Sequence, residues 1–381
     1  MKKVMILAAA AALVLAGCSK NEITENPGRV PESIPIGFSN YVPRSTDTKA
    51  NSNYVAEGSA LPTGTNGHFG VYAWAVSTTS TTPWTAGPFF GASTPGVPGF
   101  MSNVDVTFGG NEAGTEGTAN TYSPTRYWPA GDTPDGLSFI AYYPYNATSP
   151  LGNGSFGAKT FTVAAAAADQ IDFMVSNVVA DQWYGHTNSS NSHAGTVDLT
   201  FHHLLTKVRF YFVTDNSDEN TTVTLTNARL QGIYKTNTLT TGYTAGASAN
   251  SGTTALDWSS SASDADSFDV TINGTTPSSS NVVLSTTATA CANGDVFLMV
   301  PQTIAASQQK ITLTWTVTTS DVTTTNVKTI DLYDITAGGT HIDWEKNKQV
   351  SYTITIGPKP IRFTATVDGW DTETTGSLTV N

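Results

Sequence analysis

Apolar and polar residues alternate with a period of two over much of this chain, which is the spacing of a β-strand with one buried and one exposed face. Residues 311–317 are the clearest case, because isoleucine, leucine, tryptophan and valine alternate there with threonine. Residues 69–76, 137–145 and 171–176 are instead largely apolar on both phases. The first pattern predicts a half-buried strand, and the second predicts central strands that are covered on both faces.

Turn residues separate the strands, and no long helical pattern interrupts them. In the second half, strands are predicted at residues 222–234, 295–301, 310–319, 327–335, 350–357 and 361–370. The alanine-rich residues 163–170 predict one or two helical turns, too few to supply the crossover helices of a parallel sheet. The pattern predicts an all-β sandwich or barrel and argues against a parallel nucleotide-binding sheet.

Length and composition add the scale of the molecule and its charge. The chain has 381 residues, 39% of them hydrophobic, which is enough for two domains of ordinary size. Only 13% are charged, and 30 acidic residues against 18 basic ones give a net charge of −12. This excess of negative charge argues against nucleic acid and anionic membrane surfaces as partners.

The N-terminus carries an export signal. Lys2 and Lys3 precede an apolar run over residues 4–15, which has the length of a signal-peptide core and is too short to span a bilayer. The run ends in Leu15-Ala16-Gly17-Cys18, which resembles the lipobox of bacterial lipoproteins. We expect a signal peptide at residues 1–17, a lipid on Cys18 and a flexible tether at residues 18–32. An ordinary secretory signal with a chance cysteine is the alternative.

The cysteine count bears on stability. If Cys18 carries a lipid, only Cys291 remains, so an internal disulfide is not expected even in an oxidising compartment. We interpret Cys291 as a small buried or turn residue rather than a nucleophile.

The first predicted strand follows the tether. Ile34, Ile36 and Phe38 alternate with proline, glycine and serine. Because Pro35 lacks an N–H donor, we expect this strand at the edge of a sheet. A polar loop that contains Arg44 and Lys49 comes next.

Two adjacent histidines stand in residues 197–212, "VDLTFHHLLTKVRFYF". His203 shares the phase of the apolar residues, and His202 falls on the other phase. Since successive strand residues point to opposite faces, the pair cannot chelate one metal ion together. We predict that His203 is a core or interface residue that donates to a backbone carbonyl. The apolar phase then slips by one residue before Val208, and we interpret this slip as the passage between two domains.

Catalytic and metal sites find little support in the sequence. A zinc site made by His186, His193 and a strand histidine is an alternative, although no spacing typical of zinc is present. Asp169, Asp172 and Asp198 are candidates for a glycosidase pair, but their spacing does not demand one. No nucleophile elbow, zinc-helix motif or phosphate-binding loop appears. We therefore expect no catalytic residues, no metal, no cofactor and no enzymatic activity.

A surface lipoprotein that binds glycans is a competing interpretation. The chain has 8 Trp and 14 Tyr residues, which are the side chains that stack on sugars. Trp84 and Trp183 lie in loop-like surroundings, although most such aromatic residues anchor cores or loops.

Several motifs follow one another in a characteristic order. The lipobox and the "IPIGF" strand are followed by Tyr127-Trp128-Pro129, "LSFIAYYP", "VDLTFHHLLTKVRF", "WEKNKQVSYTITI" and "IRFTATVDGW". This order resembles the fimbrillin-like lipoproteins of Bacteroidales, the subunits of type V pili. The resemblance implies two transthyretin-like antiparallel β-sandwich domains in tandem, expected at residues 33–200 and 201–381. It also implies a structural subunit of a surface fimbria that supports adhesion, with other pilus subunits as partners.

The same resemblance implies a route of assembly. Such subunits reach the cell surface as outer-membrane lipoproteins, and an arginine-specific protease then removes the first strand. A strand of a neighbouring subunit fills the emptied groove. Arg44 is the expected cleavage site, Lys49 the second candidate and Arg29 a poorer one, while an unprocessed loop arginine is the alternative. The tail at residues 371–381 contains "SLTV", which suits a donor strand or a local edge. The position in the pilus and any host or glycan ligand stay open.

Overall fold

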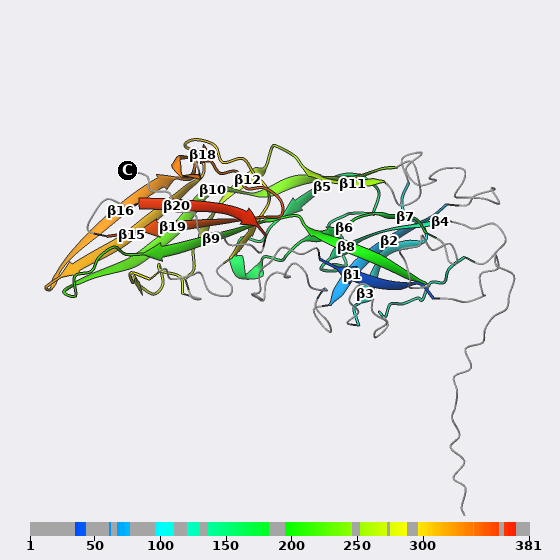
Figure 1. Cartoon of the computed structure of the whole chain (residues 1–381), viewed down its shortest axis with the longest axis horizontal. Coiled ribbons are helices and arrows are strands. Elements are labelled where there is room, and N and C mark those ends of the chain that lie inside the picture. Colours follow the sequence, from blue (N-terminus) through cyan, green and yellow to red (C-terminus); the bar gives the residue numbers. More distant parts are fainter. Residues whose placement is uncertain are drawn as a thin grey trace, which may run out of the picture.

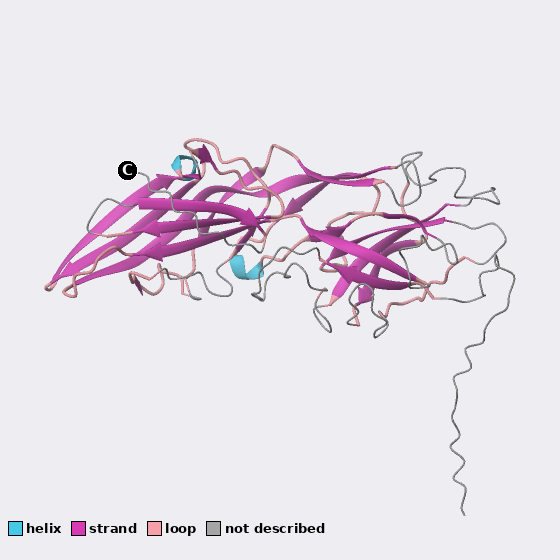
Figure 2. Ribbon diagram, viewed as in Figure 1, coloured by secondary structure: helices cyan, strands magenta, loops and turns pink. Residues whose placement is uncertain are grey.

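The structure is a computed structural model in which the strands account for nearly all regular elements (Figures 1 and 2). It describes residues 35–42, 61, 67–76, 96–109, 120–129, 136–182, 195–245, 252–272, 275–287, 296–337, 339–357 and 362–370. Within these ranges the only helical elements are the single turns η3 (Ala167–Asp169) and η4 (Leu332–Asp334). The all-β prediction is confirmed, as is the short helical turn expected within residues 163–170.

Strands of the first half form one sheet of seven strands. They are β1 (Gly37–Tyr41), β2 (His68–Val76), β3 (Met101–Thr107), β4 (Gly136–Tyr143), β6 (Met174–Ser176), β7 (Val179–Gln182) and β8 (Thr196–His203). Their order is β1-β8-β6-β4-β2-β3, and β7 pairs with β4. The first strand lies at the edge, as the position of Pro35 predicts, and it runs parallel to β8.

The central strands β2 and β4 are covered on both faces. Val71 and Ala73 belong to a smaller apolar cluster on the face where β1 packs. Tyr72 and Trp74, on the other phase of β2, belong to a larger cluster that continues through the second half. Because the side chains on each face of β2 pack into a core of their own, the residues on both faces can be apolar. The prediction that this strand is covered on both faces is confirmed for Phe69 to Trp74. Ala75, predicted to be covered as well, is exposed.

Strands of the second half, together with β5, form two further sheets (Figure 1). The larger cluster draws residues from both of them. One has the order β11-β10-β15-β16, with β5, β12 and β13 also paired to β10, and the other has the order β14-β9-β19-β20. The first contains β5 (Gly157–Thr162), β10 (Thr221–Thr244), β11 (Thr253–Trp258), β12 (Ser263–Asp269), β13 (Val282–Val283), β15 (Lys310–Thr319) and β16 (Val322–Asp331). The second contains β9 (Thr206–Val213), β14 (Phe297–Met299), β19 (Lys348–Thr355) and β20 (Arg362–Gly369), and the pair β17 (Thr336–Ala337) and β18 (Thr340–His341) stands apart.

Most pairings are antiparallel, as a sandwich of this kind predicts. Two are parallel, β1 with β8 and β9 with β19. Both join segments that are far apart in the sequence, so neither arises from a hairpin.

The chain changes sheets directly after the histidine pair. β8 ends at His203 in the first sheet, and β9 begins at Thr206 in the sheet of the second half. The slip in apolar phase is therefore the point where the chain passes from one sheet to the other. β5, from the first half of the sequence, nevertheless pairs with β10, and the larger cluster draws residues from both halves. The division into domains at residues 33–200 and 201–381 stays a prediction.

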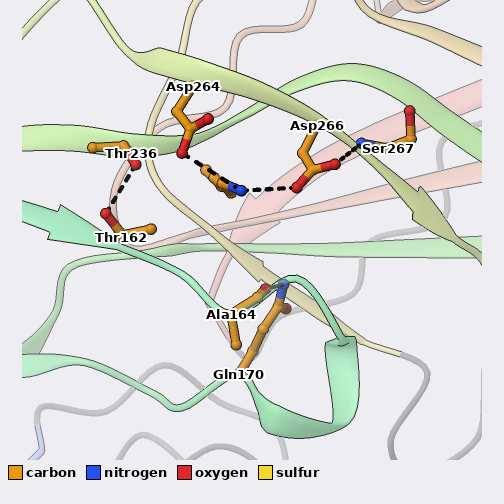
Figure 3. A network of polar contacts seen from close by, with 8 residues as sticks. Thr162, Ala164, Gln170, Thr236, Asp264, Asp266 and Ser267 are labelled. Carbon is orange, nitrogen blue, oxygen red and sulfur yellow. Dashed lines mark hydrogen bonds and ion pairs between the residues drawn. The ribbon is translucent and has the colours of Figure 1, made fainter.

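Polar side-chain contacts surround η3 and the strands β10 and β12 (Figure 3). Gln170 donates to the carbonyl of Ala164 at 3.0 Å and accepts from the backbone N–H of Leu298 at 2.7 Å. The Lys235 ammonium on β10 contacts Asp266 and Asp264 of β12 at 2.9 and 3.5 Å. The Gln170 bond to Leu298 holds the helical turn against β14, and the Lys235 ion pairs link the neighbouring strands β10 and β12.

Candidate functional site

The first strand and the residues beside it occupy a groove lined by the smaller apolar cluster, here called the β1 slot. Ile36, Phe38 and Val42 are each at most 2% exposed and belong to that cluster. The Phe38 ring packs edge-on against Phe69 and Phe139, with centroid distances of 6.1 and 5.9 Å. Burial of each such side chain contributes roughly 1.5–3 kcal/mol, so the strand forms part of the core rather than a surface addition.

One edge of the strand is held by β8. The register pairs Gly37 with Thr196 and Tyr41 with Thr200, and the N–H of Gly37 donates to the carbonyl of Gly195 at 2.8 Å. In a parallel pair every second residue of a strand bonds to a given neighbour. The odd-numbered residues of β1 therefore bond to β8, and the backbone groups of the even-numbered residues point to the opposite edge.

A covering segment, residues 120–129, closes that opposite edge. The N–H of Ile36 donates to the carbonyl of Arg126 at 2.9 Å, and the Tyr122 hydroxyl donates to the carbonyl of Ile36 at 2.8 Å. Two residues along, the Asn120 amide donates to the carbonyl of Phe38 through a short hydrogen bond. In the part of the chain that the structure describes, the outer edge of the strand is thus satisfied largely by side chains and not by a further strand.

The covering segment is itself fixed to the sheet. Thr121 exchanges two backbone hydrogen bonds with Thr107 at the end of β3, and the Asn120 side-chain oxygen accepts from the N–H of Gly109 at 3.0 Å. The Trp128 indole donates to the carbonyl of Gly195 at 3.1 Å. Because these anchors do not involve β1, the segment remains fastened to the sheet by bonds of its own.

A fully buried amide stands at the end of the strand. Asn40 is 0% exposed, and its side-chain oxygen accepts from the backbone N–H of Leu61 at 2.9 Å. This contact gives the slot one polar position among apolar ones.

The processing and anchoring residues named from the sequence lie outside the described residues. These are Cys18, Arg29, Arg44 and Lys49, together with Ile34 of the first predicted strand. Val42 is the last described residue before Arg44, two positions away along the chain. Among the helices in the described ranges, none is long and apolar enough to cross a membrane.

The histidine pair takes the arrangement that strand alternation predicts, with one difference in partner. His203 is 2% exposed, whereas His202 is only half-buried. The prediction that His203 donates to a backbone carbonyl is wrong, because its Nδ1 pairs with a carboxylate oxygen of Asp172 at 2.9 Å. The histidine ring also stacks on Trp370 at a centroid distance of 4.0 Å. The sequence pattern did not predict that Asp172 contacts His203, since the two residues lie on different segments.

The candidate catalytic carboxylates have separate surroundings. Asp172 pairs with His203, Asp198 accepts a hydrogen bond from the Ser39 hydroxyl of β1, and Asp169 is exposed on η3. Across the described residues, no group of three or more His, Cys, Asp or Glu side chains is placed to hold a metal ion. His186, His193 and Cys291 lie outside those residues.

A cleft of about 620 Å³ lies beside β5 and is lined by Asn146, Lys159, Phe161 and Asp169, among others. Sugar stacking needs a free aromatic face. One face of Phe161 is covered by Phe173, stacked on it at 4.4 Å. Phe161 therefore offers the cleft at most one ring face, and Trp84 and Trp183 lie outside the described residues.

Comparisons with known proteins agree with this architecture. The family model described as fimbrillin-like matches residues 48–370. The fimbrium subunit Fim1C of Phocaeicola vulgatus is 28% identical over 217 residues, which cover 53% of this chain and 49% of that protein. The matched part thus spans about half of the relative's length.

A fimbrial protein from Bacteroides vulgatus, known from a crystal structure, has the same fold. It superposes with a TM-score of 0.56 at 22% identity, over 88% of this chain and 99% of that one. The family match covers most of the chain, and the chain therefore belongs to the fimbrillin-like family.

Proposed function

We propose that this protein is a structural, non-catalytic subunit of a bacterial surface fimbria that supports adhesion and assembles by exchange of its first strand. The observation that carries the proposal is the β1 slot, where a short N-terminal edge strand contributes Ile36, Phe38 and Val42 to a core made otherwise by later segments. A strand of this kind can leave and be replaced by a strand of another chain, because the sheet behind it is complete.

The order of features along the chain supports proteolytic control of this exchange. Cys18, the expected lipid attachment site, precedes β1, and Arg44 follows it. A cut after Arg44 would separate both the lipid and the first strand from the rest of the chain. The same bond therefore governs release from the outer membrane and opening of the slot.

The donor is expected to be a strand of a neighbouring subunit of the same or a related kind. The tail at residues 371–381 ends in "SLTVN", in which Leu378 and Val380 alternate with polar residues. This pattern matches the alternation of Ile36 and Phe38 in the strand that would be replaced.

Cleavage of the purified, unlipidated protein tests the proposal. Before the cut, the protein should be monomeric because its own strand occupies the slot at high effective concentration. After a trypsin-like protease, which cuts after both arginine and lysine, has acted, ladders of stable oligomers or filaments should appear in size-exclusion chromatography and electron microscopy. Arg44→Ala should block the reaction if Arg44 is the site, and Lys49→Ala is the matched control.

A cleaved protein that stays monomeric at high concentration, with its slot emptied, would contradict strand exchange as the mode of assembly. Cleavage that persists in Arg44→Ala and disappears in Lys49→Ala would move the site to Lys49.

A further inference from the structure

The hydrogen bonds that Asn120 and Tyr122 make to the strand at the outer edge of the β1 slot reach only its main-chain atoms. Tyr122 and Asn120 donate to the carbonyls of Ile36 and Phe38, which lie two residues apart on one edge of the strand. Every extended polypeptide presents carbonyls at this spacing on each edge. The contacts therefore require an extended backbone and not a particular sequence.

We propose that Asn120 and Tyr122 form a carbonyl latch that retains whichever extended strand occupies the slot, first the chain's own β1 and then the donor strand of a second subunit. The donor part of this inference rests on the proposed function, whereas retention of the chain's own strand does not. The latch explains how an edge strand of five residues is held on both sides although, among the described strands, only β8 pairs with it.

The anchoring of the two donors supports a preformed latch. Asn120 receives the N–H of Gly109 on its oxygen, which orients its amide nitrogen toward the slot. The ring of Tyr122 packs against Phe38 at 5.7 Å, and burial raises the pKa of its phenol, so the hydroxyl keeps its proton at neutral pH. An emptied slot would leave Asn120 without the Phe38 carbonyl and Tyr122 with only its longer contact, 3.3 Å, to the Arg126 carbonyl of its own segment, and a donor strand would restore both hydrogen bonds.

Release of the cut strand measures the latch directly. A recognition sequence for a site-specific protease is inserted after Arg44, so that the strand can be cut whether or not native processing uses that bond. Loss of the N-terminal fragment from the folded protein is then followed by native chromatography with mass spectrometry. A synthetic peptide of residues 33–44 serves as the probe for rebinding.

Two conservative variants remove the donors and keep the packing. Tyr122→Phe retains the ring against Phe38, and Asn120→Asp retains an acceptor for Gly109. Tyr122→Phe should release the fragment roughly five-fold faster and bind the peptide roughly five-fold more weakly, as expected for loss of one hydrogen bond. Asn120→Asp should have at least this effect, because its carboxylate also repels the Phe38 carbonyl. Tyr127→Phe, a change in a 48% exposed residue of the same segment, is the control and should behave as the wild type.

The resistance to denaturant is compared between protein with a strand in the β1 slot and protein from which the strand has been released. This comparison distinguishes a latch that holds the strand from a general structural role of Asn120 and Tyr122. The variants should lower the resistance to denaturant of the strand-filled protein more than that of the emptied protein, because the carbonyls of the strand are absent from the emptied slot and Tyr122 keeps only its longer contact to the Arg126 carbonyl. Release and rebinding within two-fold of wild type in both variants would overturn the latch. An equal loss of stability in filled and emptied protein would assign Tyr122 and Asn120 to the covering segment alone. Neither outcome depends on whether the cleaved subunits polymerise.

Discussion

His203 has a buried environment made by three segments that are distant in the sequence. Its Nδ1 pairs with Asp172, its ring stacks on Trp370 after the last strand, and it lies at the end of β8. Lys207, also buried, donates to the carbonyl of Trp370 at 3.2 Å. Through its contact with Trp370, His203 thus links the end of β20 to β8, the strand that pairs with β1.

Replacement of His203 by alanine should destabilise the protein by about 2–4 kcal/mol. The change removes the hydrogen bond to a buried carboxylate, worth about 1–3 kcal/mol, and an aromatic contact worth about 0.5–1.5 kcal/mol. His202→Ala is the matched control and should cost less than about 1 kcal/mol, because that side chain is only half-buried. Urea denaturation of the two variants gives the comparison, and equal losses would contradict the assignment of His203 to the core.

The neighbouring His202 predicts a pH dependence of stability. Burial lowers the pKa of His202 from its usual 6.5, and the nearby His203 and Lys346 act in the same direction. Below pH 6.5 the unfolded chain then binds more protons than the folded one, so stability falls as the pH drops from 6.5 toward the folded pKa; above 6.5 this effect is absent.

His202→Gln tests this pH dependence, since glutamine does not titrate and can still donate to Asn177. The variant should lose less unfolding free energy than the wild type between pH 7.5 and pH 5.5. Equal losses would show that His202 does not contribute to the acid-side decline.

At the scale of elements, β10 shows how a strand can continue through an irregular point. It spans Thr221–Thr244, although the residue pattern predicts a strand only over residues 222–234. The register against β12 shifts between Gln231 and Ile233, and Gly232 has a φ of +71°. This bulge lets the strand pair with β15 before it and with β5 and β11 after it.

Gly232→Ala should destabilise the protein by about 1–3 kcal/mol. A Cβ there would require a strained backbone and would lie 2.4 Å from the carbonyl oxygen of Gln308. Gly242→Ala, on the same strand, is the control: its Cβ would make an ordinary 3.7 Å contact with Ala255, and the change should stay within about 0.5 kcal/mol. Thermal unfolding of both variants measures the difference. A Gly232→Ala protein as stable as the control would exclude a requirement for glycine at the bulge.

At the scale of the whole molecule, the expected lipid, the first strand and the cleavage loop follow one another at the N-terminus. Cys18→Ala should remove the lipid and leave the precursor in the soluble fraction of cell lysates, because acyl chains contribute about 0.8 kcal/mol per buried CH₂ to membrane binding. Metabolic labelling with a fatty acid and fractionation check this result, and Cys291→Ala is the control. Fatty acid on the Cys18→Ala protein would contradict the assignment of the lipidation site.

The sequence by itself determined the fold class, the edge position of the first strand and the faces of the histidine pair. These properties follow from local rules. A period of two identifies a strand, the missing N–H of Pro35 favours an edge, and successive residues of a strand point to opposite sides. The slip of phase after Leu205 likewise located the change of sheet, because a strand that keeps one buried face cannot lose its register without leaving that face.

Only the tertiary structure decided which segments meet. Asp172 at His203, and Asn120 and Tyr122 at the β1 slot, are brought together by pairing between strands that lie far apart along the chain. Polar residues in a loop carry no periodic signal, so their roles could not be derived from the pattern. Parallel pairing of β1 with β8 is of the same kind, since it joins residues 159 positions apart and depends on the core that both strands enclose.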